Sequence, residues 1–392
     1  MRTLTASIDG QVVAWRDRRR WLWLLGLVVP LLPVLGGGLA LSLGLRAGWW
    51  MGPLFVVAIA PLLDLLAGSN TQNPPEWAQV PLESDRYYRW CTYLFVPLQY
   101  GTFISGCWVA MRLPGLETVD RIGLCLTLGV VGGVAIATAH ELGHKKTKLE
   151  RWLARVALAQ TAYGHFFVEH NVGHHTRVAT PEDPASSRLG ESFYAFWPRT
   201  VVGSLKSAWL LEKHRLERHG YSPFTLHNQL ITAWAMTAVL FATLLVWLGL
   251  ALLPLLLTQA IVGFSMLEVI NYLEHYGLLR QRDGEGKYQR CTPQHSWNSS
   301  HAASNLLLYN LARHSDHHAW PARRYQVLRH FTESPQLPAG YATMLMLALV
   351  PPLWRRVMDP RVRAHYGGDP ALANVQPGAG PALRAKATDV LP

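Results

Sequence analysis

Half of the 392 residues are apolar, 16% are charged, 16 are tryptophans, and the formal net charge is +11. Such a composition is typical of a membrane protein with tryptophans at the lipid–water boundary. It argues against a nucleic-acid-binding protein, because the basic residues lie at the ends of apolar runs. The four cysteines form no Cys-x-x-Cys pair, so no iron–sulfur centre is fused to this chain.

Several apolar runs are long enough to cross a hydrocarbon core about 30 Å thick. Within residues 21–139, after a polar segment over 1–20, they extend from Trp21 to Leu45, Trp49 to Ala67, Trp90 to Met111 and Ile122 to Ala139. An apolar stretch over 230–273 is twice the length of one span, and we expect it to break near Gly249 to Pro254. The sequence predicts an all-α integral membrane protein with six transmembrane helices.

Two polar segments, 140–229 and 274–359, are expected to form a helical cap outside the membrane. Within the second, Tyr341 to Leu353 is too short to cross, so it should lie at the interface or pack on the core. Residues 360–392 are rich in Pro, Gly and Ala, and we expect a disordered tail.

Basic residues mark one side of the predicted membrane. They precede the first span, follow the fourth (Lys145, Lys146, Lys148, Arg151, Arg155) and follow the sixth (Arg280, Arg282). By the positive-inside rule, both termini and both polar segments are predicted to be cytoplasmic.

Nine of the 17 histidines lie in four groups on that same side. The groups are His140 with His144; His170 with His174 and His175; His275; and His314 with His317 and His318. Residues three or four apart share a helix face, and imidazole is the commonest metal ligand at neutral pH. Nine ligands are too many for one tetrahedral zinc and suit two metals of higher coordination.

Two other functions compete for this pattern. The segment His140 to His144 matches His-Glu-x-x-His, the zinc metalloprotease signature in which Glu141 would be the general base. Such a protease has no use for seven further clustered histidines. A metal transporter would need ligands near the bilayer midplane, whereas these lie beyond the helix ends.

Four motifs resemble those of the membrane-bound alkane 1-monooxygenases. They are the histidine boxes His140–Lys145, Glu169–His175 and Arg313–His318, and the HYG motif in Asn271–Gly277. Ala312 departs from the family pattern, in which a glutamine usually precedes the arginine. The family is related to xylene monooxygenase and, more distantly, to fatty-acid desaturases and hydroxylases.

The resemblance implies a non-haem di-iron enzyme of the bacterial cytoplasmic membrane, with all nine histidines as iron ligands. Its reaction would be terminal hydroxylation of linear, medium-chain alkanes by O2. Electrons would come from a separate rubredoxin and its NAD(P)H-dependent reductase. Hydroxylation of a xylene methyl group or a fatty-acyl chain remains the alternative within this class.

Other residues are assigned from position. Metal-bound histidines usually donate their second N–H to a carboxylate or carbonyl, and the candidates are Glu141, Glu169, Asp183, Glu274 and Asp316. Asp64, inside a span, is expected to hydrogen-bond a ligand histidine or its neighbouring arginine. Bulky Trp49, Trp50 or Phe55 could close a substrate channel. Lys145, Lys146, Lys148, Arg151, Arg323 and Arg324 would attract an acidic rubredoxin.

Overall fold

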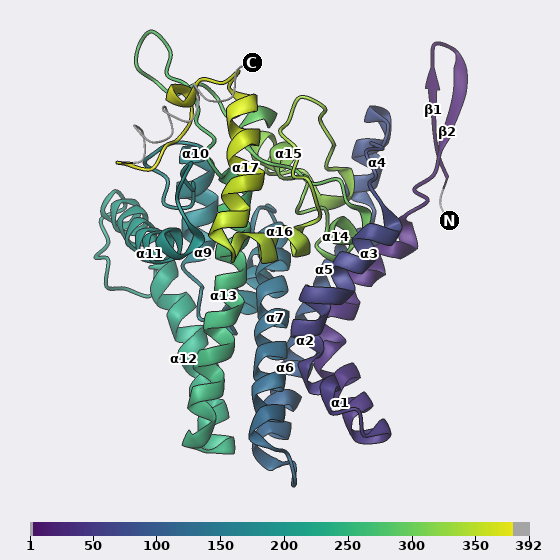
Figure 1. Cartoon of the computed structure of the whole chain (residues 1–392), viewed down its shortest axis with the longest axis vertical. Helices are drawn as coiled ribbons and strands as arrows, with labels where there is room; N and C mark the ends of the chain where they lie inside the picture. The colour runs from purple at the N-terminus through teal and green to yellow at the C-terminus, as the bar shows by residue number, and fades with distance from the viewer. Residues whose placement is uncertain (1–2, 379–392) are drawn as a thin grey trace.

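The computed structural model describes residues 3–378, which form a largely helical protein (Figure 1). Within these residues, six helical segments are long and apolar enough to cross a membrane. They cover Arg20–Leu43, Arg46–Ala67, Arg86–Arg112, Thr118–Gly143, Gln229–Leu248 and Leu250–His275. The six-span helical architecture predicted from the sequence is confirmed, including the break between the last two spans, which falls at Gly249 with φ 99°.

Several spans consist of more than one element. The first is the 3-10 helix η1 (Arg20–Leu31) and α1 (Leu32–Leu43); the second is η2 (Arg46–Trp50), α2 (Met51–Leu54), the π-helix η3 (Phe55–Ile59) and α3 (Ala60–Ala67). The others are α5 (Arg86–Tyr93) with α6 (Phe95–Arg112), α7 (Thr118–Gly143), α12 (Gln229–Leu248), and η6 (Leu250–Leu252) with α13 (Leu253–His275).

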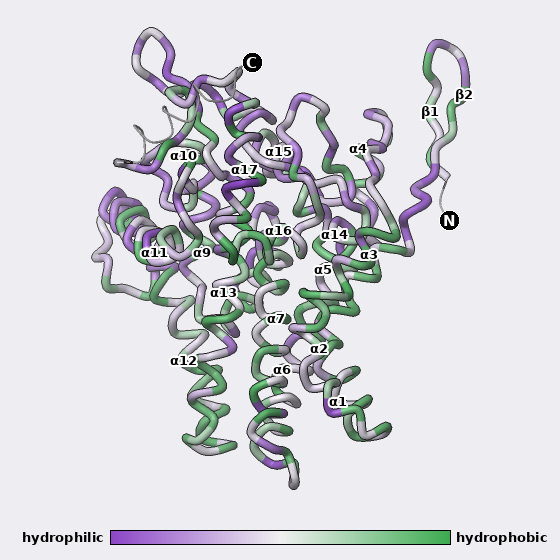
Figure 2. The backbone as a smooth tube through the Cα atoms, in the orientation of Figure 1, coloured by the Kyte–Doolittle hydropathy of each residue, from purple (hydrophilic) through white to green (hydrophobic). Residues whose placement is uncertain are grey.

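The polar segments gather at one end of the bundle. Figure 2 shows the apolar helices below and the hydrophilic segments above them. The cap contains α4 (Gln79–Ser84), α8 (Lys148–Ala159), α9 (Phe166–Val168), the π-helix η5 (Glu169–His174), α10 (His175–Arg177), α11 (Phe193–Glu217), α14 (Ala302–Leu307), α15 (His314–Ala319), α16 (Tyr341–Ala348) and α17 (Pro351–His365). Short 3-10 turns connect them: η4 (Glu76–Ala78), η7 (Pro293–His295), η8 (Tyr325–Val327) and η9 (Pro370–Leu372).

Helix α7 is the central element of the bundle and packs closely on α13. Small residues make this approach possible. A Cβ at Gly129 would lie 2.7 Å from Val262 Cβ, and one at Gly133 would lie 2.9 Å from Met266 Cβ. Both helices continue from the apolar bundle into the cap. His140 lies in the last turn of α7, and His275 is the last residue of α13.

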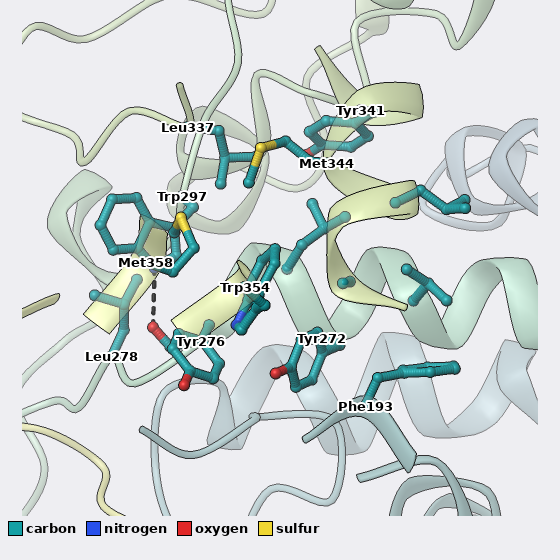
Figure 3. Packing of buried hydrophobic residues seen from close by; sticks show 14 of the residues in the cluster. Phe193, Tyr272, Tyr276, Leu278, Trp297, Leu337, Tyr341, Met344, Trp354 and Met358 are labelled. Carbon is teal, nitrogen blue, oxygen red and sulfur yellow. Dashed lines mark hydrogen bonds between the residues drawn. The ribbon is translucent and has the colours of Figure 1, made fainter. Parts of the chain in front are cut away.

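The end of α13 is held by a cluster of buried aromatic residues (Figure 3). Tyr272 and Tyr276 pack against Trp354 of α17, and Trp297 Nε1 donates a hydrogen bond to the Tyr276 carbonyl at 2.9 Å. Helix α16 contributes Met344 to the same cluster. The short apolar run that begins at Tyr341 therefore packs on the core, one of the two places expected for it.

The expectation of a disordered tail from residue 360 is wrong for residues 360–378. Helix α17 continues to His365, and Val362 is fully buried. Val375 then forms a bridge with Leu189, and Ala373 is buried. Composition misled here because a few apolar side chains at helical spacing suffice to fix a short segment on an existing core. Residues 379–392 lie outside the described residues.

The N-terminal segment forms a β-hairpin for which the sequence analysis made no prediction. Strands β1 (Leu4–Ile8) and β2 (Gln11–Trp15) pair antiparallel, with Leu4 opposite Trp15. Asp9 and Gly10 both have positive φ, 53° and 78°. An Asp-Gly pair favours this two-residue turn, so the sequence did contain a signal for the hairpin.

Gly277 should be intolerant of a side chain. Its φ is +72°, and a Cβ there would lie 2.8 Å from Val362 Cγ1. We expect Gly277→Ala to lower the free energy of unfolding by about 1–3 kcal/mol, because a left-handed backbone with a Cβ is strained. Thermal unfolding of purified protein measures the change. Gly284→Ala is the control, since that glycine has open space around it, and equal midpoints for the two variants would contradict the prediction.

Candidate metal centre

The nine predicted histidines come together in two groups at the cap end of the bundle. One group holds five and the other holds four; in each, one ligand atom per residue lies within 4.8 Å of all the others. The first group is His140, His144, His170, His175 and His317; the second is His174, His275, His314 and His318. Sequence reasoning found all nine residues but not this division.

Neighbouring histidines are divided between the groups by the local helix geometry. His170 and His175 belong to one group, although five residues in an α-helix would place them about 140° apart around the axis. The segment Glu169–His174 is instead a π-helix, whose wider turn aligns residues five apart. His175 Nε2 consequently lies 3.1 Å from His170 Nε2, and His174 points into the other group.

Helix α15 also serves both groups. His314 and His318, four residues apart, point into the second group, and their Nε2 atoms are 2.8 Å apart. His317 belongs to the first, with its Nε2 3.0 Å from His175 Nε2. Because η5 and α15 each supply both groups, the two groups form one continuous site.

The nitrogen contacts fit ligands of a common metal better than hydrogen bonds. An imidazole nitrogen carries either one proton or one lone pair, yet His314 Nε2 lies 3.3 Å from His275 Nε2 and 2.8 Å from His318 Nε2. Two nitrogens bound to one metal at about 2.0–2.1 Å and at right angles are about 3 Å apart. The Nε2 atoms of His140, His144 and His174 are buried without any hydrogen-bond partner among the described residues.

The electrostatics favour the metal-binding form of the rings. Burial, with the neighbouring histidines as a smaller cause, lowers the pKa of His144, His170 and His317 well below the ordinary value. These imidazoles are therefore neutral at pH 7, as ligation by a cation requires.

Asp183 contacts one of the nine rings from behind. Its Oδ2 lies 2.9 Å from His174 Nδ1 and also accepts a hydrogen bond from Ser186 Oγ at 2.6 Å. Burial opposes ionisation of Asp183, but its interactions with the His174 ring and the hydrogen bond from Ser186 outweigh this effect and lower the pKa of Asp183 to about 2. An ionised carboxylate at Nδ1 turns Nε2 of His174 toward the second group.

Glu274 approaches the second group from its ligand side. One carboxylate oxygen is 3.1 Å from His314 Nε2, and the other accepts a hydrogen bond from Tyr341 Oη at 2.6 Å. Glu274 therefore lies beside the candidate ligands rather than behind them. Sequence reasoning missed Tyr341, because no local pattern places the first residue of α16 next to α13.

The remaining three carboxylates that were expected to bind the histidines contact no ring nitrogen of the nine. Glu141 forms an ion pair with Lys145 at 3.0 Å, Glu169 with Arg177 at 2.7 Å, and Asp316 with Arg323 at 2.5 Å. Each carboxylate adjoins a histidine in sequence, and adjacent helical residues do not face each other. Proximity in sequence therefore placed them on the wrong face.

Asp64 also differs from its prediction. Its carboxylate accepts hydrogen bonds from the backbone N–H of Ser304 at 2.7 Å and from Ser304 Oγ at 2.5 Å. Neither a candidate ligand nor Arg313 is its partner. Asp64 instead binds the first turn of α14, where unpaired N–H groups favour a negative charge.

An apolar cavity of about 80 Å³ lies among the spans and the cap helices α14 and α16. Ala137 and Ile270, which line it, each precede a residue of the site by about one helical turn, and Leu311 precedes His314 by three residues. Ser304 and Tyr341 bring the two hydroxyl groups of its lining. The cavity therefore suits an apolar ligand and lies within about one helical turn of residues of the site.

Phe55 alone of the three predicted channel residues lines this cavity. Trp49 is buried in a cluster with Leu244 and Leu248, and Trp50 packs against Gly123, near the end of α7 that is remote from His140. Trp49 and Trp50 do not line this cavity, because five or six residues of helix rise separate them axially from it.

The comparisons with known proteins agree with this geometry. A family model described as fatty acid desaturase matches residues 121–348. The chain is 44% identical to an alkane 1-monooxygenase of Acinetobacter baylyi, over 92% of this chain and 89% of the relative. It is 45% identical to alkane 1-monooxygenase 1 of Alcanivorax borkumensis, over 94% and 91%. Identity to the hydroxylase component of a Pseudomonas putida xylene/toluene monooxygenase is 30%, over 69% and 73%.

The broader class is therefore that of the desaturase-type membrane proteins with a histidine-bound, non-haem metal centre. Within it, the chain belongs to the alkane 1-monooxygenase family. The resemblance seen in the four motifs is confirmed.

Replacing Asp183 tests how the second group is oriented. We expect Asp183→Asn to weaken metal retention by about 10–100-fold, the usual effect of losing such a carboxylate, while the protein stays folded. Metal content after dialysis against a graded series of chelator concentrations measures it. Glu182→Gln is the matched control, because Glu182 is exposed and pairs with Arg282. Indistinguishable retention curves would show that Asp183 does not orient His174.

Proposed function

We propose that this chain hydroxylates the terminal carbon of linear, medium-chain alkanes at a di-iron centre. The observation that carries the proposal is an apolar cavity lined by Ala137, Ile270 and Leu311, which lie about one helical turn before residues of the two histidine groups. Relatives named alkane 1-monooxygenase, alike over most of their length, support the substrate. The overall reaction takes one alkane, O2, two electrons and two protons and yields one 1-alkanol and one water.

The nine histidines are the proposed iron ligands, five for one ion and four for the other. Imidazole suits iron as well as zinc, and an all-imidazole donor set adds no charge of its own. When bound, the irons would supply the redox chemistry that activates O2 for C–H oxidation, which no side chain provides. The protein contributes orientation: Asp183 fixes the ring of His174, and Glu274 with Tyr341 fills the space beside His314.

The cavity is the proposed site for the end of the alkane. Residues of the spans line one part of this cavity, and residues of α14 and α16 line the rest. We propose that the alkane enters it from the lipid. The apolar walls exclude water. Only the end of the alkane that lies toward the metals is then positioned to react. Phe55 lies where an extended alkane would run between the spans and is proposed to limit its length.

The zinc-protease alternative receives no support from the geometry. A metalloprotease needs the glutamate of His-Glu-x-x-His free to activate water. Glu141 is ion-paired with Lys145 and accepts the N–H of Tyr325 at 3.3 Å. Xylene methyl and fatty-acyl oxidation remain secondary, since the xylene/toluene relative is the more distant one.

Electrons are proposed to come from an acidic rubredoxin with its reductase, on the cytoplasmic side of a bacterial inner membrane. Lys146, Lys148 and Arg151 are exposed just after His144 and support docking there. Three basic residues first included in this surface are engaged elsewhere. Lys145 pairs with Glu141, Arg323 with Asp316, and Arg324 with Glu150.

Reconstitution of the purified chain tests the proposed reaction. With rubredoxin, reductase, NAD(P)H, O2 and an alkane panel, we expect two irons per chain and 1-alkanols that disappear when rubredoxin is omitted. His175→Gln should reduce iron content toward one ion and lower turnover by about 100-fold or more, because a ligand is lost. His165→Gln is the control, a buried histidine outside both groups. One zinc per chain without alkanol would overturn the proposal.

Chain-length selection tests the role of Phe55. We expect Phe55→Leu to raise the ratio of long-chain to medium-chain hydroxylation by about tenfold, the order of effect of one or two methylene groups in an apolar pocket. Competition between two alkanes in one reaction measures the ratio directly. Trp49→Phe serves as the control, because Trp49 is buried away from the cavity. An unchanged ratio in Phe55→Leu would refute the assignment.

A further inference from the structure

A second, polar hollow shares no lining residue with the apolar cavity. Its volume is about 740 Å³, and it opens where the hairpin joins the first span. One wall is Arg16, Arg18 and Arg19, immediately before the first span begins at Arg20. The opposite wall is Asn70, Gln72 and Asn73, just after the second span ends at Ala67. Two independent span ends thus place this hollow at headgroup level.

The hollow carries excess positive charge. Among the described residues, neither Arg16 nor Arg18 forms an ion pair, and both are exposed. Burial lowers the pKa of the Arg19 guanidinium. The carboxylate of Asp17, 4.0 Å away, raises this pKa but offsets the effect of burial only in part. Asp17 is already engaged, accepting hydrogen bonds from Tyr88 Oη at 2.7 Å and Trp23 Nε1 at 3.3 Å.

Exposed apolar side chains of the spans lie close in sequence to both parts of the hollow's lining. Trp21 and Leu22 of the first span and Leu65 and Leu66 of the second are between 45% and 78% exposed. Figure 2 shows the strongly hydrophilic segment at the base of the hairpin directly beside the apolar first span. A ligand seated here would meet arginines with one end and lipid-facing leucines with the other.

We propose that this hollow binds the phosphate group of an anionic phospholipid headgroup. Arg16, Arg18 and Arg19 supply the charge, and the side-chain amides of Asn70 and Gln72 supply neutral hydrogen-bonding groups for the glycerol part. Arginine forks match phosphate oxygens, and basic pockets beside membrane helices bind such headgroups. The acyl chains lie on the exposed leucines below.

The site is connected to the histidines through the floor of the hollow. Arg313, which is buried and precedes His314, donates hydrogen bonds to the carbonyls of Asn70 and Gln72 at 3.1 Å and to Asn73 Oδ1 at 3.2 Å. A lipid that fixes the segment 70–73 therefore also fixes the start of α15. This gives the headgroup a stabilising role beyond anchoring.

Lipid binding to the full-length chain tests the proposal without requiring turnover. The protein is placed in nanodiscs of phosphatidylcholine with a rising fraction of phosphatidylglycerol, released, and analysed for retained lipid by native mass spectrometry. We expect one tightly retained phosphatidylglycerol per chain. In Arg16→Gln/Arg18→Gln its apparent affinity should fall about thirtyfold, since each basic residue at a membrane surface contributes roughly fivefold. Both side chains are exposed, so folding is not at risk.

Two further arms identify the ligand. Lys206→Gln/Lys213→Gln on α11 removes equal charge from the cap at a distance and should leave retention unchanged. Phosphatidylcholine and millimolar inorganic phosphate should neither replace phosphatidylglycerol nor raise the unfolding midpoint as it does. Equal loss in both double variants would show non-specific attraction, and displacement by inorganic phosphate would identify a soluble anion; either result overturns the proposal.

Discussion

The inward-facing nitrogens of nine imidazoles are the constraint on which the rest of this structure depends. Seven of the nine rings are buried and two are partly buried. A buried polar atom without a partner costs about 1–3 kcal/mol, so this many converging nitrogens would oppose folding unless a common partner satisfied them. A metal cation would be such a partner, and rings with a lowered pKa, such as His144 and His317, are neutral and ready to bind it. We therefore expect metal binding and folding of the cap to be coupled.

The apolar bundle provides the rigidity that this convergence needs. Helices α7 and α13 approach closely at Gly129 and Gly133 and carry candidate ligands where they leave the bundle. Their separation is fixed by packing in the lipid-facing part, not by the cap. The same two helices line the cavity with Ala137 and Ile270, so the substrate space and the histidine site share one framework.

Sequence patterns predicted which residues form the site but not how these residues are arranged. Hydropathy located six spans because apolar length is nearly sufficient to define a membrane helix, and the clustered histidines identified every member of both groups. The pairing of His170 with His175 depends on a π-helix, which no spacing rule anticipates. Glu141, Glu169 and Asp316 were misplaced because sequence adjacency was taken for contact, while Tyr341 meets Glu274 only through the tertiary fold.

Asp64 shows how a carboxylate within a span can help to position a site with which it makes no contact. Asp64 binds Ser304, Gly68 accepts the N–H of Ala302, and Asn70 donates to the Ser300 carbonyl at 2.7 Å. Arg313 extends this connection from the other side, so the end of the second span is joined to the whole segment that leads into α15. The positions of His314 and His318 therefore depend on residues some 240 positions earlier in the chain. The ionisable residue in this span thus contributes to the placement of a helix and does not contact the histidine groups.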